Sequence, residues 1–359
     1  MDIYDEEFLT LQEFAKVAKE KLTVGSWDYL IGGAETETTL KRNRQALDSV
    51  AFRPRVLRDV EDVDASGSLI GQRLRLPVLL APIGSLQDFM DGGGVVPTKA
   101  AARFGVMHML SSTCHPGLEE VAAAVDYPKV FQLYVRGDSD FVDDHINRAI
   151  DAGYAGFCFT VDLDAYGRRE RDLSKRYKTT SRKTASGEHH QLKFSWDDIK
   201  RVRDKFDIPL ILKGIATAED AEIAVRQGVD VVYISNHGGR QLDHGRGGLE
   251  VLPEIVSAVS GKAKIIFDGG VMRGTDVVKA MAMGADVVGL GRLQGLAGAA
   301  AGEEGIVRML EILETEVIST LRLLGVTSFR ELSPDFLHPA TPVRDAGTLS
   351  AFPLLDEGY

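Results

Sequence analysis

Eight short apolar runs recur along the chain between residues 76 and 292. Few polar residues alternate with the apolar ones, so the runs predict parallel strands that are buried on both faces. The predicted strands are LPVLLAPIG (76–84), HMLSST (108–113), KVFQLYV (129–135), GFCFTVD (156–162), PLILKG (209–214), DVVYISN (230–236), KIIFDGG (264–270) and DVVGLGR (286–292).

Amphipathic stretches between these runs predict helices. The clearest are FVDDHINRAIDAG (141–153), TAEDAEIAVRQG (217–228) and GTDVVKAMAMG (274–284). Each ends on a glycine shortly before the next strand, as a left-handed helix end requires: Gly153, Gly228 and Gly284. Thr217 and Thr275 lie near the starts of the second and third helices and are predicted to cap them.

Alternating strands and helices predict an α/β fold, and eight such units predict a closed (β/α)8 TIM barrel. An open doubly wound sheet is the alternative, but it concentrates its site at one switch point. Here polar residues end many different strands, which favours the barrel: Ser111, Gln132, Tyr134, Asp162, Lys213, Asn236, His237, Asp268 and Arg292.

The barrel is expected to occupy residues 76–359, with residues 1–75 as an N-terminal cap of the same domain, helical at 10–20 and 26–31. The longest interruption, 168–195, follows the fourth strand and is polar and basic. A loop of this length predicts a lid over the site. Contact with anionic membrane lipid or an electron acceptor is the alternative, but the loop lacks the apolar run needed for membrane insertion.

The net charge of −11 argues against nucleic-acid binding, because no basic excess is available for phosphates. No apolar run reaches the roughly 18 residues that span a bilayer. The N-terminus, MDIYDEEFLT, lacks the pattern of a signal peptide. Cys158 lies in a predicted buried strand and Cys114 is the other cysteine, which argues against a disulfide framework. No zinc-binding spacing is present, and we expect a cytoplasmic protein without membrane association.

The strongest chemical signal is SNHGGRQLD (235–243), directly after a strand. Two glycines allow a sharp turn, so that His237 and Arg240 face one cavity. A histidine is the commonest general base near neutral pH, and an arginine offers a planar fork to a carboxylate. The alternative is a glycine-rich turn with a surface histidine and arginine, but the polar residues at the other strand ends disfavour it.

Two further motifs support a site for an organic acid. In TVDLDAYGRRERD (160–172), Asp162 ends a strand and is placed to bond His237, while Arg169 offers a second carboxylate contact. Lys213 ends an apolar strand, where a charge needs an anionic partner. The alternatives are a solvated loop arginine for Arg169 and an ion pair with Asp162 for Lys213.

Glycine-rich ends on the last two predicted strands indicate a phosphate site. DGGVMRGTDV (268–277) and GLGR (289–292) combine backbone N–H groups with Arg292 at the place where barrels bind phosphate.

Together these motifs resemble those of the FMN-dependent 2-hydroxy acid oxidases and dehydrogenases, the family of glycolate oxidase, lactate oxidase, mandelate dehydrogenase and the flavin domain of flavocytochrome b2. The resemblance extends from WDYLIGGAETETTL and FRPRVLRDV to GLGR, and SNHGGRQLD is its most specific part. It implies oxidation of a small (S)-2-hydroxy acid to the 2-oxo acid by FMN, with electrons passed to O2 or another acceptor, in a homotetramer.

The resemblance also implies residue roles. His237 takes a proton from the substrate, Asp162 pairs with it, Lys213 supports the reduced flavin, and Tyr134 assists at the reacting centre. The implied substrate-binding residues are Tyr29, Tyr134, Arg169, Arg240, Thr113 and Tyr166. The implied cofactor-binding residues are Pro82, Ile83, Gly84, Ser111, Gln132, Thr160, Lys213, Ser235, Asp268, Gly270, Arg273, Gly291 and Arg292.

Departures from the family pattern have expected consequences. Met272 replaces the first arginine of DGGVRRG, which leaves the phosphate to Arg292, backbone amides and Arg273 and predicts weaker FMN binding. Leu293 replaces the proline of GRP. Thr113 replaces a bulky aromatic residue and widens the pocket, whereas Tyr166 replaces a smaller aliphatic residue and narrows it. Gly84 leaves the choice between oxidase, dehydrogenase and monooxygenase open.

Two other functions remain as alternatives. One is another FMN barrel enzyme such as a type 2 isopentenyl diphosphate isomerase. That enzyme does not require a carboxylate pocket, which is predicted here from Tyr29, Tyr134, Arg169 and Arg240. The other is a non-catalytic flavin-binding protein, which needs no base.

Overall fold

Eight parallel strands close into a barrel in the computed structural model, which describes residues 7–184 and 190–358. The predicted barrel is confirmed, and each predicted strand overlaps one of these strands. Six predicted ranges contain their strand entirely, whereas Met107 and Ile215 lie one residue outside the predicted ranges 108–113 and 209–214. They are β4 (Val78–Leu80), β5 (Met107–Ser111), β6 (Val130–Leu133), β7 (Gly156–Thr160), β8 (Leu210–Ile215), β9 (Val231–Ile234), β10 (Lys264–Phe267) and β11 (Val287–Leu290), with β11 paired to β4.

Both faces of these strands are buried, which explains the continuous apolar runs. On β9, Val231 and Tyr233 belong to the cluster inside the barrel, while Val232 and Ile234 belong to the cluster beneath the helices. All four are at most 1% exposed. A short antiparallel pair, β2 (Gly67–Leu69) and β3 (Gln72–Leu74), adds apolar side chains to the inner cluster and so closes one end of the barrel.

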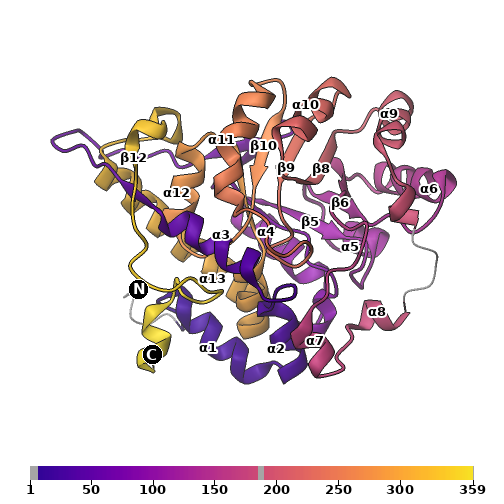
Figure 1. The fold of residues 1–359 in the computed structure, drawn as a ribbon, viewed down its shortest axis with the longest axis horizontal. Coiled ribbons are helices and arrows are strands. Elements are labelled where there is room, and N and C mark those ends of the chain that lie inside the picture. Colours follow the sequence, from indigo (N-terminus) through magenta and orange to yellow (C-terminus); the bar gives the residue numbers. More distant parts are fainter. Residues whose placement is uncertain (1–6, 185–189, 359) are drawn as a thin grey trace.

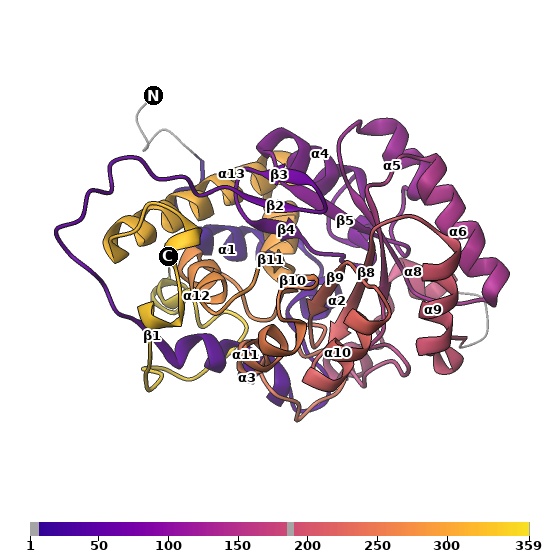
Figure 2. The ribbon, with the colours of Figure 1, turned by 90° about the horizontal axis from the view of Figure 1, so that it is seen from above.

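Helices surround the strands (Figure 2). They are α4 (Val95–Phe104), α5 (Leu118–Ala124), α6 (Ser139–Asp151), α9 (Trp196–Lys205), α10 (Ala218–Arg226), α11 (Gly248–Val259), α12 (Gly274–Ala282) and α13 (Arg292–Leu324). α13 is two helices joined at Ala301 and Gly302, whose backbone is not helical. None of the described helices has the length and apolar content needed to cross a bilayer.

Most of the predicted helix ends are confirmed. Gly153, Gly228 and Gly284 have φ values of 73°, 74° and 105°. Thr217 caps α10 by accepting a hydrogen bond from the N–H of Asp220. The prediction for Thr275 was wrong, because it lies inside α12. The Asp276 carboxylate caps that helix instead, accepting from the N–H groups of Met272 and Arg273.

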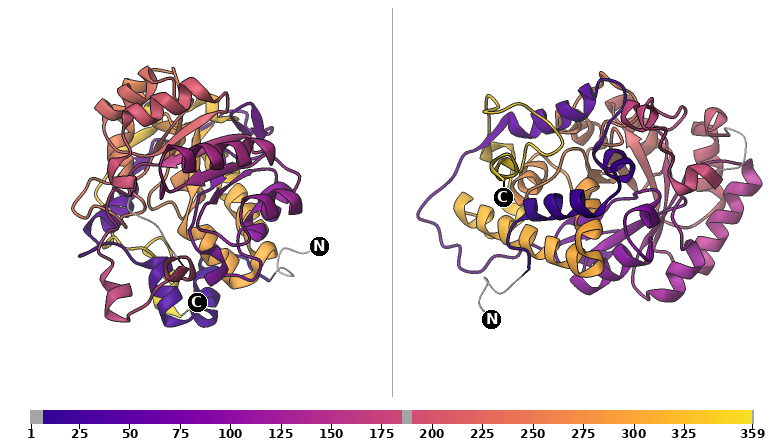
Figure 3. Two further views of the ribbon diagram at one scale, coloured as in Figure 1. Left: turned by 90° about the vertical axis from the view of Figure 1, so that its right-hand side faces the viewer. Right: turned by 90° about the horizontal axis from the view of Figure 1, so that it is seen from below.

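The N-terminal cap consists of α1 (Leu11–Lys21), α2 (Val24–Ile31) and α3 (Thr38–Asp48), of which the sequence predicted the first two. α1 packs along α13, as the right-hand view of Figure 3 shows. After α3, β1 (Val50–Phe52) pairs with β12 (Leu337–Pro339) from the C-terminal part of the chain. The remaining short elements are 3-10 helices: η2 (Leu86–Asp88), η3 (His190–Lys193), η4 (Phe329–Glu331), η5 (Pro334–Phe336) and η6 (Pro353–Glu357).

The predicted lid, 168–195, contains α7 (Glu170–Ser174), α8 (Thr180–Thr184) and η3. Its residues 185–189 lie outside the described part of the chain. α7 lies beside α2 of the cap (Figure 1). Arg171 donates to both carboxylate oxygens of Glu37, and Lys175 pairs with Asp28, so ion pairs attach this segment to the cap.

Candidate active site

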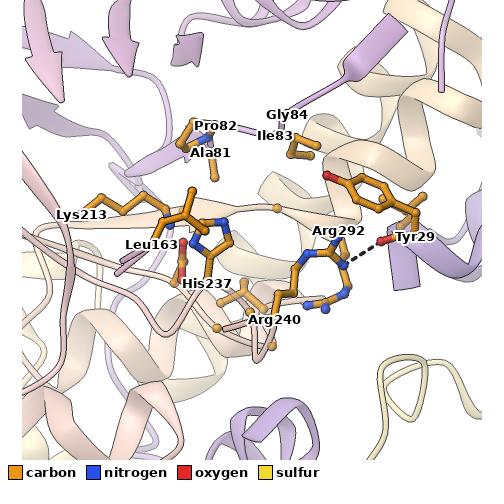
Figure 4. Close-up of a pocket in the computed structure, with 18 of the residues that line it drawn as sticks. Tyr29, Ala81, Pro82, Ile83, Gly84, Leu163, Lys213, His237, Arg240 and Arg292 are labelled. Atoms are coloured by element: carbon orange, nitrogen blue, oxygen red, sulfur yellow. Dashed lines mark hydrogen bonds between the residues drawn. The ribbon is translucent and has the colours of Figure 1, made fainter. Parts of the chain in front are cut away.

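A cavity that is partly open to solvent lies at the carboxyl ends of the barrel strands (Figure 4). Figure 4 shows His237, Arg240 and Tyr29 around this space, with the segment from Ala81 to Gly84 along another side of it. The structure brings most of the predicted site residues to its wall: Tyr29, Pro82, Ile83, Gly84, Thr113, Tyr134, Tyr166, Arg169, Lys213, His237, Arg240, Asp268, Gly270, Gly291 and Arg292.

His237 and Asp162 form a pair whose side chains are 14% and 15% exposed. Nδ1 of His237 lies 2.9 Å from Oδ1 of Asp162, and Nε2 lies 3.4 Å from the hydroxyl of Tyr134. Burial lowers the pKa of His237 to about 4, although Asp162 opposes this shift. Burial raises the pKa of Asp162, but His237 and Lys213 outweigh it and hold that pKa below its ordinary value. The pair is therefore a neutral imidazole and a carboxylate near neutral pH, with Nε2 available as a base.

The glycines after His237 are required by the backbone. His237, Gly238 and Gly239 have φ values of 59°, 64° and 74°, a left-handed run that places Arg240 beside the histidine. A Cβ atom at Gly239 would lie 2.5 Å from Cα of Leu40, and one at Gly238 would lie 2.6 Å from Nη1 of Arg292. The SNHGGRQLD turn therefore fits only because these positions have no side chain.

Two guanidinium groups meet at the cavity wall. Arg240 donates from Nη1 to the carbonyls of Tyr29 and Gly32 at 2.6 and 2.8 Å, and its Cζ lies 4.5 Å from the centre of the Tyr29 ring. Arg169, which is 5% exposed, donates to the hydroxyl of Tyr166. Burial lowers the pKa of Arg240, and the neighbouring charge of Arg169 adds to this effect. One buried and one half-buried cation at the same wall indicate a site for an anion such as a carboxylate.

Lys213 and Asp268 line the same cavity. Lys213 is 4% exposed, and its charge lowers the pKa of Asp162 and opposes the burial that raises the pKa of Asp268. Ser235 donates to Oδ1 of Asp268 at 2.7 Å and accepts from the N–H of His237 at 3.0 Å. Ser235 therefore links the base to the strand ends of β9 and β10 without lining the cavity itself.

The glycine-rich end of the cavity has one guanidinium group fewer than the sequence predicted. Arg292 lines it, and burial lowers its pKa to about 9, with the charge of Arg240 adding to the shift. Arg273 does not reach the cavity wall, because its Nη2 pairs with Oε1 of Glu316 at 2.5 Å. Met272 lies at the wall instead. Arg292 and the backbone of Gly270 and Gly291 are therefore the groups placed for a phosphate.

Unpartnered polar atoms at the strand ends fit the predicted flavin. Among the described residues, neither amide atom of Gln132, nor Oγ1 of Thr160, nor Nε of Arg292 has a hydrogen-bond partner. Gln132 and Thr160 are 0% exposed. Buried polar groups are normally satisfied, so these side chains indicate a ligand with polar ring edges. Ser111, also predicted at this edge, is buried and shares a 3.1 Å hydrogen bond with Thr113.

The sequence interpretation missed several residues of the site. Gln241, next to Arg240, donates to the carbonyls of Asp162 and Ala165 and accepts from Arg169. Its place inside SNHGGRQLD was the available signal. Other apolar wall residues, such as Phe89 and Leu163, carried no sequence signal of their own. Gly84 also packs closely against Thr113. A Cβ atom at position 84 would lie only 2.5 Å from Oγ1 of Thr113.

The chain is similar to known proteins over most of its length. Residues 18–339 match the FMN-dependent dehydrogenase family. A glycolate oxidase of Arabidopsis thaliana, glycolate oxidase 3, is 37% identical over 349 residues, which cover 91% of this chain and 95% of that protein. An L-lactate oxidase of Nostoc sp. is 36% identical over 359 residues, which cover 92% of this chain and 98% of that protein.

Solved structures match the fold as well as the sequence. The crystal structure of mandelate oxidase with (S)-2-phenylpropionate superposes with a TM-score of 0.87 at 36% sequence identity, covering 94% of this chain and all of that chain. The crystal structure of mandelate oxidase with benzoyl-formic acid gives the same TM-score and identity.

Proposed function

Because the chain belongs to the FMN-dependent dehydrogenase family, we propose that it is an oxidoreductase that oxidises a small (S)-2-hydroxy acid to the corresponding 2-oxo acid. The observation that carries this proposal is the convergence of a neutral imidazole and two guanidinium groups on one cavity at the carboxyl ends of the strands. α-Carbon oxidation of an acid requires both a base and a carboxylate anchor.

FMN is the cofactor, and when bound it takes up two electrons from the substrate and passes them to an acceptor. Arg292 and the glycine backbone at positions 270 and 291 would hold its phosphate. Gln132 and Thr160 would bond the polar edges of its ring system, while Lys213 would offset negative charge there.

The protein residues bind and orient the acid and move its proton. Arg169 and Arg240 hold the carboxylate by charge-assisted hydrogen bonds. The hydroxyls of Tyr29 and Tyr134 orient the substrate oxygens, since both tyrosines line the cavity. Nε2 of His237 takes the proton, and the resulting imidazolium is stabilised by Asp162 through Nδ1.

Thr113 and Tyr166 are two wall residues that differ from the usual family pattern, and we assign them to the substrate side chain. The isomerase and the non-catalytic alternatives are disfavoured by the oxidases among the relatives and by the buried base. O2 is the proposed electron acceptor, because these relatives are named oxidases. The homotetramer and the cytoplasmic location stay predictions from the sequence.

Anaerobic titration tests the function directly. The purified protein should be yellow, and glycolate, lactate or mandelate should bleach its flavin absorbance. Air should then restore the colour. A preparation that cannot take up FMN, or a bound flavin that none of these acids bleaches, would contradict the proposal.

A further inference from the structure

Arg182, on α8, lies against the ring of Tyr166 at the mouth of the cavity. The Cζ atom of Arg182 is 3.8 Å from the ring centre, and the Cζ atom of Arg169 is 4.1 Å from the same point. The hydroxyl of Tyr166 also accepts a hydrogen bond from Nη1 of Arg169. Arg182 is exposed and is not part of the cavity wall, whereas Arg169 is buried in it. Tyr166 therefore connects a lid residue to a residue of the carboxylate site.

Hydrogen bonds attach α8 to loops that border the cavity. The N–H of Thr180 donates to Oδ2 of Asp88 at 2.8 Å. Ser181 donates to the carbonyl of Thr113 and accepts from Ser85 at 2.8 Å. These partners belong to the loops after β4 and β5, which also carry Gly84 and Thr113 of the wall. The backbone of Arg182 is thus fixed relative to the cavity.

Arg169 depends on Tyr166 because its other hydrogen bonds are long. Its Nη2 lies 3.3 Å from Oε1 of Gln241, and its Nε lies 3.4 Å from the carbonyl of Arg240. Such lengths are at the weak limit for N–H donors. Tyr166 itself is 36% exposed, so its ring has space to turn toward solvent if its outer face loses the guanidinium of Arg182. The contacts that then remain to the Arg169 guanidinium are these two long hydrogen bonds and the ring of Tyr29, whose centre lies 5.6 Å from Cζ.

We propose that Arg182 is a positioning residue for the substrate carboxylate, which fixes Tyr166 and through it orients Arg169. This inference rests on the proposed function, because it takes Arg169 as a carboxylate ligand. An arginine suits the role, since its planar guanidinium stacks on an aromatic ring in a way that a lysine ammonium does not.

The test uses the FMN-loaded enzyme with Arg182→Ala, Arg182→Lys and Tyr166→Phe. Lys183→Ala is the matched control, because Lys183 is the next residue of α8 and is also exposed. Three quantities are measured: the Kd of oxalate, from the change in flavin absorbance, and kcat and KM with the best 2-hydroxy acid. We expect Arg182→Ala and Arg182→Lys to raise both Kd and KM about five- to tenfold, from the lost stacking and a weakened charge-assisted hydrogen bond. The value of kcat should change less than about twofold, because uniform binding is what is lost.

The double variant Arg182→Ala/Tyr166→Phe separates an indirect role from a direct one. If Arg182 acts through the hydroxyl of Tyr166 on Arg169, the alanine should add little to the effect of Tyr166→Phe. Full additivity, or an Arg182→Ala enzyme that matches Lys183→Ala, would overturn the inference. An enzyme that binds oxalate in an Arg182-dependent manner but is not reduced by any 2-hydroxy acid would refute the proposed function and support the role of Arg182. A wild-type enzyme that neither binds oxalate nor is reduced would refute both.

Discussion

His237 donates its Nδ1 hydrogen to Asp162 across 2.9 Å and thereby leaves Nε2 without a hydrogen, 3.4 Å from the hydroxyl of Tyr134. The carboxylate does two things at once. It fixes the tautomer of the ring, and it stabilises the imidazolium that forms when Nε2 takes a proton. Burial acts against that charge, which is why the pKa of His237 falls to about 4 despite the neighbouring carboxylate.

Replacing His237 with Gln should abolish flavin reduction while leaving FMN bound. The amide keeps much of the side-chain shape but cannot act as a base near neutral pH. General bases contribute roughly 10²- to 10⁴-fold, so the anaerobic reduction rate should fall by at least that range. Stopped-flow absorbance measures the rate, and the visible spectrum verifies that the cofactor is retained. Reduction of the variant at the wild-type rate would show that another group is the base.

The pH profile should reflect the depressed pKa of His237. The base works only when deprotonated, so kcat/KM should fall as the pH is lowered through about 4 rather than through the ordinary histidine value near 6.5. Asp162→Asn removes the carboxylate that raises this pKa, so the acid limb should move to still lower pH while the rate itself drops. An acid limb near pH 6.5 in the wild type, or an upward shift in Asp162→Asn, would contradict the assigned environment.

Gly214 offers a way to displace Asp162 without touching the substrate. Its φ is 117°, and a Cβ atom there would lie 2.7 Å from Cβ of Asp162. Gly214→Ala should therefore lower kcat/KM about tenfold or more, because small displacements of catalytic groups have large effects. Gly228→Ala is the control, since φ is 74° but the nearest atom, in Arg203, lies 3.6 Å away. It should lower the thermal midpoint but preserve kcat/KM, and equal losses of activity in both variants would contradict the argument.

Much of the fold was predictable because the barrel imposes a simple pattern. Strands such as β9 bury both faces, so Val231 to Ile234 form a continuous apolar run that identifies them. α3 was not predicted, because its helix carries polar residues that are buried by the rest of the fold, among them Asn43 and Arg44. Asn43 exchanges amide hydrogen bonds with Asn236 at 2.8 and 2.7 Å, a contact between residues 193 positions apart.

The residues of the site also divide into those whose position was predictable from the sequence and those whose position was not. His237, Arg240 and Asp162 follow strands, and parallel strands deliver their carboxyl ends to one place, so their convergence was predictable. The direction of Arg273 was not. Its backbone is extended before α12, and the side chain turns to Glu316 on α13, a partner that sequence spacing gives no means of identifying. The contact of Arg182 with Tyr166 depends on how α8 docks, which is likewise a tertiary property.

The phosphate end makes a prediction about cofactor affinity. Met272 lies at the cavity wall where an arginine would face the phosphate. Met272→Arg should strengthen FMN binding about tenfold or more, because hydrogen bonds between charged groups contribute roughly 1.5–3 kcal/mol. Riboflavin, which lacks the phosphate, should gain nothing. Fluorescence quenching of each flavin by the apoprotein measures both affinities.

Two controls accompany that comparison. Met272→Leu conserves volume without adding charge and should leave both affinities unchanged. Arg273→Gln should also preserve FMN affinity, because Arg273 is paired with Glu316. Equal gains for FMN and riboflavin in Met272→Arg, or a loss of FMN in Arg273→Gln, would contradict the placement of these two side chains.

Arg44 tests how firmly the N-terminal cap is joined to the barrel. It donates to both oxygens of Asp276 at 2.7 and 2.8 Å, and the two side chains are 4% and 1% exposed. Arg44→Met leaves the Asp276 carboxylate buried without its counter-charge, so the free energy of unfolding should fall by about 3–5 kcal/mol. Arg148→Met is the control, because Arg148 and Glu119 are 41% and 53% exposed, and such pairs contribute about 0–1 kcal/mol.

Urea unfolding at one fixed FMN concentration measures both losses of unfolding free energy. A cap and barrel that form one domain, as we propose, unfold in a single transition that Arg44→Met moves to lower urea. A separate early transition in the wild type, or a loss no larger than that of Arg148→Met, would mean that α3 is only loosely attached.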